Sequence, residues 1–187
     1  AATVKNFVYG HKSGATPGTL AALVGALRRY GTKTLAEVVA PAIELAEAGA
    51  PWTPAYQAFL QKYTAKMWES DYLRGLFMKD GIEVWGVDHV YCNPDHAAFL
   101  RRLLAAGPDD FYRGRIAAEI EADMLAHGGW LRRSDLALME AVEREPMRGP
   151  YRDLEVLSVT MPPGGAVVIE TLGIIDGFAA ALLRERA

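Results

Sequence analysis

Residues 142–183 read VEREPMRGPYRDLEVLSVTMPPGGAVVIETLGIIDGFAAALL, and this stretch decides the fold class. Val142–Met147 and Tyr151–Val159 have the short apolar pattern of two strands, joined around Gly149-Pro150. Two strands alone are only marginally stable in water, so this pair needs a sheet to join. After a Pro-Gly break the period becomes helical, with large apolar side chains around nearly the whole circumference, as in a buried helix. We predict a β-hairpin over about 141–160 and a buried helix over about 166–183.

The preceding residues, 16–140, are predicted to be mostly helical, because their apolar side chains recur at helical spacing. Thr16 is expected to cap a first helix over 17–30, and Thr34 with Glu37 has the spacing of a capping box for a second. Helix start and stop residues divide the run into short segments. The fold class is therefore α+β, mainly helical with a short two-stranded β segment.

The central part of this helical region is less regular. Residues 54–75 follow the period of one longer, more polar helix, and residues 76–90 are predicted to form an irregular loop with a small hairpin. Asn93-Pro94-Asp95 has the composition of a helix start. No linker or repeat interrupts the chain, so 1–187 is expected to be a single segment, incomplete because its hairpin and last helix lack cover.

Composition excludes several classes of protein. The 187 residues are 51% hydrophobic and carry a net charge of −3, which is too apolar for a disordered chain and lacks the basic stripe of a nucleic-acid partner. The single cysteine excludes an internal disulfide. No apolar run reaches the roughly 18 residues of a membrane span, and residues 1–20 lack a signal-peptide pattern.

One short segment has the residue types of a zinc site. Asp88, His89, Cys92 and His96 fall within nine residues, and such side chains bind zinc. Asn93-Pro94 interrupts the set and no second ligand cluster follows, so a loop and a first helical turn without metal are favoured. Cys92 could also act as a nucleophile beside a histidine, but a small, partly buried residue beside a helix cap is favoured, because free cysteines are usually buried and inert.

Three further groups have a structural explanation that competes with a functional one. Pro163-Gly164-Gly165 could hold an anion at a helix N-terminus, although it lacks the spacing of a Walker loop and a tight turn is favoured. The acidic residues fit a solvated helix face or a helix start, and the aromatic residues of 52–72 fit core positions better than a groove. The residues are Asp109, Asp110, Glu119, Glu121 and Asp123, and Trp52, Tyr56, Phe59, Tyr63, Trp68 and Tyr72.

Five blocks, taken together and in order, resemble those of one family. They are Thr16–Ala21 (TPGTLA) with Arg29–Thr32 (RYGT), Pro41–Gly49 (PAIELAEAG), Gly107–Ala117 (GPDDFYRGRIA), Gly128–Ala137 (GGWLRRSDLA), and Glu143–Pro146 (EREP) with Tyr151-Arg152 and Met161–Gly165 (MPPGG). Together they are similar to the γ-glutamyltransferase (γ-glutamyltranspeptidase) family, in the C-terminal part of its large-subunit region. The last block is shortened and lacks both serines of the family pattern, which suggests a divergent branch.

The resemblance implies an N-terminal-nucleophile hydrolase with a four-layer αββα sandwich. Such a precursor cuts itself into two subunits, and the new N-terminal threonine attacks a γ-glutamyl amide such as that of glutathione, before transfer to an amine or to water. The partner would be the small subunit, or the remainder of the precursor, and the location periplasmic or secreted. The family's catalytic residues lie outside the matched blocks, so no catalytic, cofactor-binding or metal-binding residue is predicted here, no cofactor is expected, and the chain alone should be inactive.

Two other interpretations remain open from the sequence. The chain could be a non-catalytic helical protein-interaction module that uses the aromatic region 52–72 or the helix 166–183. It could also be the subunit of a related acylase or amidohydrolase, because these enzymes share the fold and differ in their substrates.

Overall fold

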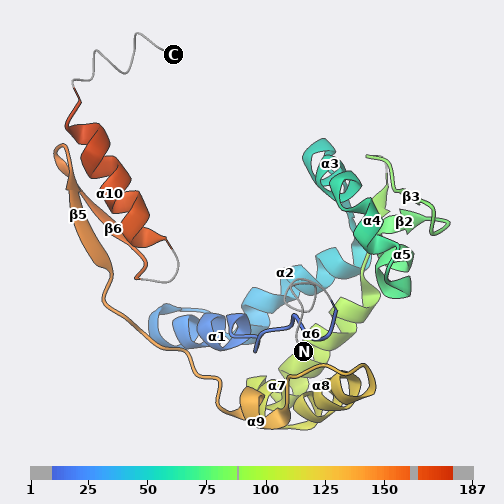
Figure 1. Ribbon diagram of the computed structural model, residues 1–187. Coiled ribbons are helices and arrows are strands. Elements are labelled where there is room, and N and C mark those ends of the chain that lie inside the picture. Colours follow the sequence, from blue (N-terminus) through green and yellow to red (C-terminus); the bar gives the residue numbers. More distant parts are fainter. Residues whose placement is uncertain (1–9, 88, 161–163, 179–187) are drawn as a thin grey trace. The chain divides into compact units, whose positions relative to one another are not determined.

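The computed structural model describes residues 10–87, 89–160 and 164–178 (Figure 1). The chain divides into two compact units, Ala1–Ala141 and Val142–Ala187, and each is described by itself. The prediction of a mainly helical α+β chain is confirmed. The small hairpin expected within 76–90 is present as Met78–Lys79 paired with Glu83–Val84, and the pair of Ala50–Pro51 with Val90–Tyr91 was not predicted.

Unit 1 is built from helices with two small antiparallel strand pairs. Its helices are α1 (Thr19–Tyr30), α2 (Leu35–Ala48), α3 (Pro54–Lys62), α4 (Thr64–Met67), α5 (Asp71–Phe77), α6 (Pro94–Ala106), α7 (Pro108–Tyr112), α8 (Arg115–Ala126) and α9 (Arg133–Ala137). Its strand pairs are β1 (Ala50–Pro51) with β4 (Val90–Tyr91), and β2 (Met78–Lys79) with β3 (Glu83–Val84).

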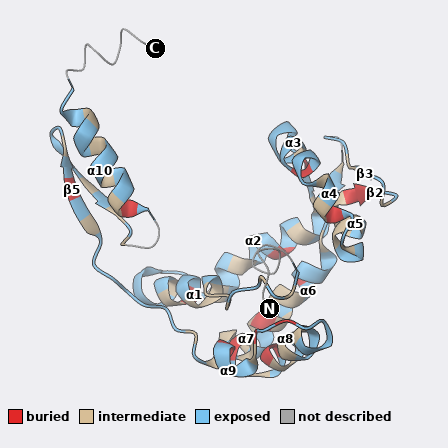
Figure 2. Ribbon diagram, in the orientation of Figure 1, coloured by how far each residue is buried: buried red, intermediate tan, exposed pale blue. Residues whose placement is uncertain are grey.

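Eight of the buried side chains of unit 1 form two separate clusters (Figure 2). One joins α1, α7, α8 and α9, and its buried members are Tyr112, Ala117, Leu131 and Leu136. The other lies among α3, α4, α5 and the β2–β3 hairpin, with Trp52, Leu60, Met67 and Met78 at its centre. The helices around each cluster are short, and short helices are stabilised mainly by packing against one another. Each cluster therefore depends on several helices rather than on one long helix.

Local start signals explain most element boundaries in unit 1. Thr34 and Glu37 form the predicted capping box at the start of α2, and the Asn93 side chain accepts the His96 backbone N–H at the start of α6. Thr16 does not cap α1, which begins after Gly18 with no side-chain cap. The prediction of one helix over 54–75 is also wrong, because the chain breaks at Tyr63 and Ser70 caps a new helix, α5.

Unit 2 consists of the hairpin β5 (Met147–Tyr151) and β6 (Leu154–Ser158) with helix α10 (Gly165–Asp176) against one face. The turn lies at Arg152-Asp153, where Arg152 has a φ of 56°, and not at Gly149-Pro150 as the sequence pattern suggested. Gly149 instead pairs with Val156 inside the hairpin, where a Cβ would overlap the Ile169 side chain of α10. Its missing side chain is what lets the helix lie against the strand.

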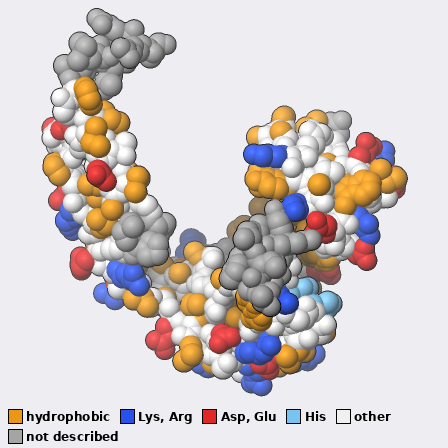
Figure 3. All heavy atoms as spheres, in the orientation of Figure 1, with side chains coloured by type: hydrophobic (Ala, Val, Ile, Leu, Met, Phe, Trp, Pro, Cys, Tyr) orange, Lys and Arg blue, Asp and Glu red, His pale blue; other side chains and the backbone are white. Residues whose placement is uncertain are grey.

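Among the described residues of unit 2, helix α10 packs on the hairpin with one side. Its described part ends at Asp176, followed by Gly177 and Phe178, so the last residues of the predicted helix 166–183 lie outside the described ranges. Gly165 is its only buried residue, while Val167, Val168 and Ile174 are 49–60% exposed. Figure 2 shows the helix mainly exposed, and Figure 3 shows apolar side chains gathered along this unit. The burial predicted from its apolar circumference therefore stays a prediction for the complete protein.

None of the described helices combines the length and the apolar character that crossing a bilayer requires.

Candidate functional site

Two of the blocks that resemble the family meet at one side-chain hydroxyl in unit 1. Tyr112, from the GPDDFY block, is 4% exposed. Its hydroxyl donates to the Pro17 carbonyl at 2.9 Å and accepts the Ala21 backbone N–H at 2.9 Å. Pro17 and Ala21 belong to the TPGTLA block, and Ala21 lies in the first turn of α1, whose N–H groups have no helical partner. The tyrosine thus does the capping that Thr16 was expected to do.

The turn between α7 and α8 explains other residues of the same GPDDFYRGRIA block. The Asp110 carboxylate accepts the Arg115 backbone N–H at 2.7 Å, which satisfies an open N–H group at the start of α8. Gly114 lies directly beneath this carboxylate, and a Cβ there would approach the Asp110 Cα to 2.8 Å. The bond from Arg115, with the nearby Arg102 guanidinium, lowers the pKa of Asp110. Asp110 therefore has the structural role that its position at a helix start suggested.

An ion network on the surface joins α6 to α8. Arg102 lies 2.6 Å from Glu119 and 3.4 Å from Asp110, and Arg115 lies 2.9 Å from Glu119. The hydrogen bond from Arg102 lowers the pKa of Glu119 and raises the pKa of the arginine. The network links helices by charge, and it leaves none of its carboxylates in the protonated form that a general acid needs at neutral pH.

The end of the PAIELAEAG block is held close to strand β4. Gly49 has a φ of 82°, and a Cβ there would lie 2.6 Å from the Cys92 Sγ and 2.9 Å from the Tyr91 carbonyl oxygen. The Asn93 backbone N–H donates to the Ala46 carbonyl at 2.8 Å. The glycine is therefore required both by its backbone conformation and by the close approach of β4.

The structure separates the described members of the predicted zinc segment. His89 stacks on Trp85 with ring centroids 4.1 Å apart, and His96 stacks near Phe99. Among the described residues, His89, Cys92 and His96 do not bring three ligand atoms within 4.8 Å of one another, and Asp88 lies outside them. Cys92 is exposed beside the β1–β4 pair. The two histidines are therefore engaged in aromatic contacts.

The other sequence candidates are dispersed. Trp52 belongs to the buried cluster of α3–α5, as expected. The core positions expected for the other aromatic residues of 52–72 are wrong, because their side chains are 41–60% exposed: Tyr56, Phe59, Tyr63, Trp68 and Tyr72. Glu121 accepts the Arg133 backbone N–H at 3.0 Å at the start of α9. Pro163 lies outside the described residues, and Gly165 packs so closely on the Val159 carbonyl that a Cβ would overlap it, which is the contact of a tight strand-to-helix turn.

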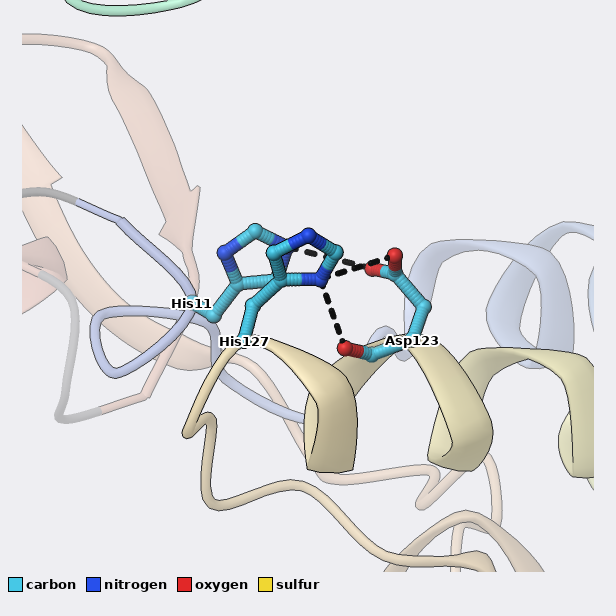
Figure 4. Close-up of side chains that lie close together, drawn as sticks. All are labelled: His11, Asp123 and His127. Carbon is cyan, nitrogen blue, oxygen red and sulfur yellow. Dashed lines mark hydrogen bonds and ion pairs between the residues drawn. The ribbon is translucent and has the colours of Figure 1, made fainter.

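One cluster was missed from the sequence and becomes visible only in the fold. Asp123, considered as part of a solvated helix face, lies beside the stacked rings of His11 and His127 (Figure 4). The His11 Nε2 is 3.1 Å from the Asp123 Oδ2, and the His127 Nδ1 is 3.2 Å from the Oδ1. The i, i+4 spacing of Asp123 and His127 on α8 was a signal for this pair. Nothing in the local sequence pairs either residue with His11, which lies more than 100 positions away.

Comparison with known proteins places these features in a family. A family model described as gamma-glutamyltranspeptidase matches residues 1–186. The chain is 34% identical over 176 residues to the glutathione hydrolase proenzyme of Escherichia coli (strain K12), covering 93% of this chain and 30% of that protein. It is also 34% identical over 173 residues to the acylase ACY 1 proenzyme of Pseudomonas sp. (strain SE83), covering 91% of this chain and 31% of that protein.

Solved structures give the same grouping. The γ-glutamyltranspeptidase of Helicobacter pylori matches with a TM-score of 0.88 and 28% identity, covering 99% of this chain and 53% of that chain. The cephalosporin acylase of Bacillus halodurans matches with a TM-score of 0.79 and 31% identity, covering 91% and 33%. The chain thus spans about a third of the length of its curated relatives. Through the family match over nearly its whole length and through these shared folds, the chain belongs to the γ-glutamyltranspeptidase family.

Proposed function

We propose that this chain is a large-subunit segment of a γ-glutamyltransferase-like N-terminal-nucleophile enzyme. The complete enzyme transfers or hydrolyses γ-glutamyl amides, such as glutathione, through an acyl-enzyme on the threonine of a second subunit. The observation that carries the proposal is the family match over residues 1–186. The names of both curated relatives include the word proenzyme, which supports a precursor that is processed.

The role we propose for this segment is to form part of the frame of the enzyme. Its family blocks are engaged in structural contacts: Tyr112 caps α1, Asp110 closes the α7–α8 turn over Gly114, and Gly49 admits β4. Each contact depends on backbone geometry and leaves no described side chain of these blocks arranged as a nucleophile with a base. The reaction would then depend on residues supplied by the rest of the precursor.

The exposed apolar surface of unit 2 supports this incompleteness. Val142, Leu157 and Val159 are 55–72% exposed, in addition to the outer side of α10. A two-stranded hairpin with an uncovered apolar helix is a poor independent structure in water. The remainder of the precursor would extend the hairpin into a larger sheet and cover α10, as an αββα sandwich requires.

Hydrolysis of γ-glutamyl-p-nitroanilide tests the proposal. The 187-residue chain should show no turnover, whereas a longer chain that includes the downstream reading frame should cut itself into two polypeptides and release p-nitroaniline. Replacing the first residue of the new subunit with alanine should abolish both events. Turnover by the 187-residue chain alone would contradict the proposal that the reacting residues come from the rest of the precursor. Absence of processing and of turnover in the longer chain would favour an interaction module instead.

An acylase is the second candidate function, because the identity to the Pseudomonas acylase equals that to the Escherichia coli glutathione hydrolase, at 34%. Glutaryl-p-nitroanilide distinguishes the two, since it differs from the γ-glutamyl compound only by the missing α-amino group. A γ-glutamyltransferase should prefer the γ-glutamyl donor by a large factor, because a site built for the ammonium group leaves buried polar groups unpaired without it. Equal or faster cleavage of the glutaryl compound by the longer chain would assign the acylase function.

A further inference from the structure

The cluster of His11, Asp123 and His127 lies outside the family blocks that frame unit 1 (Figure 4). Its members come from two segments that are far apart in the chain: His11 belongs to the turn before α1, and Asp123 and His127 lie at the C-terminal end of α8. Their ligand-capable atoms all lie within 4.8 Å of one another. The two imidazole rings stack, with centroids 4.4 Å apart and planes inclined by 12°.

The backbone holds these side chains in place from both directions. Asp123 and His127 are four residues apart, so they share one face of the helix end. The turn containing His11 is closed by bonds from the Ser13 backbone N–H and hydroxyl to the Gly10 carbonyl, at 3.0 and 2.8 Å. Gly129 allows this turn to approach α8, because a Cβ at Gly129 would lie 2.9 Å from the His11 carbonyl oxygen. The three side chains are thus brought together by the fold, not by the flexibility of one loop.

Two spacings in this donor set fit a divalent transition-metal ion. The ion would replace the 2.9 Å bond that joins the His127 Nδ1 to the Asp123 backbone carbonyl, and the two rings would turn out of their stack to face it. Two imidazoles and one carboxylate are ligands of zinc, at 2.0–2.2 Å from the ion. Two ligands of one tetrahedral ion at such distances lie about 3.3 Å apart. The two nitrogen–oxygen separations here are 3.1 and 3.2 Å. The side chains are 37–58% exposed, so solvent can reach the positions that three protein ligands leave open.

We propose that His11, Asp123 and His127 bind one Zn²⁺ ion, or a similar first-row divalent ion, and so fasten the segment before α1 to the end of α8. Water would complete the coordination, because three protein ligands leave a tetrahedral ion one open position. The role is structural, and it does not depend on the proposed enzymatic function.

Titration of the metal-free 187-residue chain with ZnCl₂ by calorimetry tests the site, in a Cys92→Ser background that removes the thiol. We expect one ion per chain, with affinity reduced at least tenfold by His11→Ala, Asp123→Asn or His127→Ala. His96→Ala is the matched control, since His96 is an exposed histidine of another helix, and should leave the affinity unchanged. Far-UV circular dichroism of each variant checks that the helices remain.

CoCl₂ provides a readout that does not depend on the variants. Co²⁺ bound by nitrogen and oxygen ligands should give visible d–d absorption bands that saturate at one equivalent and disappear on addition of Zn²⁺. Failure to bind either ion stoichiometrically at 100 µM, or Zn²⁺ affinity that survives both His11→Ala and Asp123→Asn, would overturn the proposal and reduce the cluster to a hydrogen-bonded contact.

Discussion

Removing the Tyr112 hydroxyl should destabilise unit 1, because this one group makes two hydrogen bonds. Tyr112→Phe keeps the ring, which packs edge-to-face on Phe111 at 4.9 Å, and deletes only the group that links Pro17 to Ala21. Two neutral hydrogen bonds contribute about 1 kcal/mol each, and the half-buried Ala21 N–H is left without a partner. The expected loss in the free energy of unfolding is about 2–3 kcal/mol.

Urea unfolding followed by far-UV circular dichroism measures this loss. With an m-value of about 2 kcal/mol/M, the midpoint should fall by about 1–1.5 M, and the melting temperature by about 5–10 °C. Hydrogen exchange should accelerate first in the opening turn of α1. Tyr72→Phe is the control, because Tyr72 is 60% exposed and should change the midpoint little. Equal midpoints for the two variants, with normal protection of α1, would refute the bridging role of Tyr112.

Three further perturbations test other parts of the frame. Gly114→Ala should lower the free energy of unfolding by about 2 kcal/mol, because its Cβ meets the Asp110 backbone. Gly75→Ala is the control: it lies in open space on α5 and should leave the stability unchanged or raise it. Equal thermal midpoints for the two variants would contradict this. The pKa values of Asp110 and Glu119 are lower in the folded state, so both carboxylates stabilise the fold at pH values above their unfolded-state pKa values. The free energy of unfolding should therefore fall as the pH drops below about 4.5. The fall should be shallower in Arg102→Gln when acid titrations of the two proteins are compared. Gly149→Ala should loosen α10 from the hairpin and speed its amide exchange, while Gly173→Ala, with free space around it, should not; slow exchange in both would show that the close approach to Ile169 is unimportant.

Local chemistry made much of the fold predictable from sequence. The capping box of Thr34 and the Asn93 helix start are determined by residues within three positions, and both appear as expected. Two of the wrong boundaries, at Thr16 and at the hairpin turn, have their cause in longer-range contacts, whereas the break within 54–75 follows from the local Ser70 cap. The Tyr112 hydroxyl of α7, and not Thr16, accepts the N–H group at the start of α1. The hairpin turn lies at Arg152-Asp153, because Gly149 lies inside the hairpin in close contact with α10.

The candidate sites show the same division between local and distant contacts. The spacing of His89, Cys92 and His96 was a local signal, but the two histidines stack on Trp85 and Phe99, and the three described side chains do not meet as a ligand set. The cluster of His11 with Asp123 arises between positions more than 100 residues apart, which no periodicity can pair. Resemblance identified the family because it compared whole blocks, two of which are joined across the fold by the Tyr112 hydroxyl.

The family blocks therefore identify this chain through packing rather than through chemistry. Gly49 and Gly114 are required because any Cβ would overlap a neighbouring backbone, and Tyr112 because its hydroxyl satisfies two groups of another block. Such residues tolerate little substitution whatever the substrate, since the same frame supports γ-glutamyltranspeptidases and acylases among the matched structures. A block that is diagnostic of the family can consequently lack any reacting group. The choice between a γ-glutamyl donor and another acyl amide would then depend on the residues that line the completed active site, while this segment keeps the scaffold that holds them.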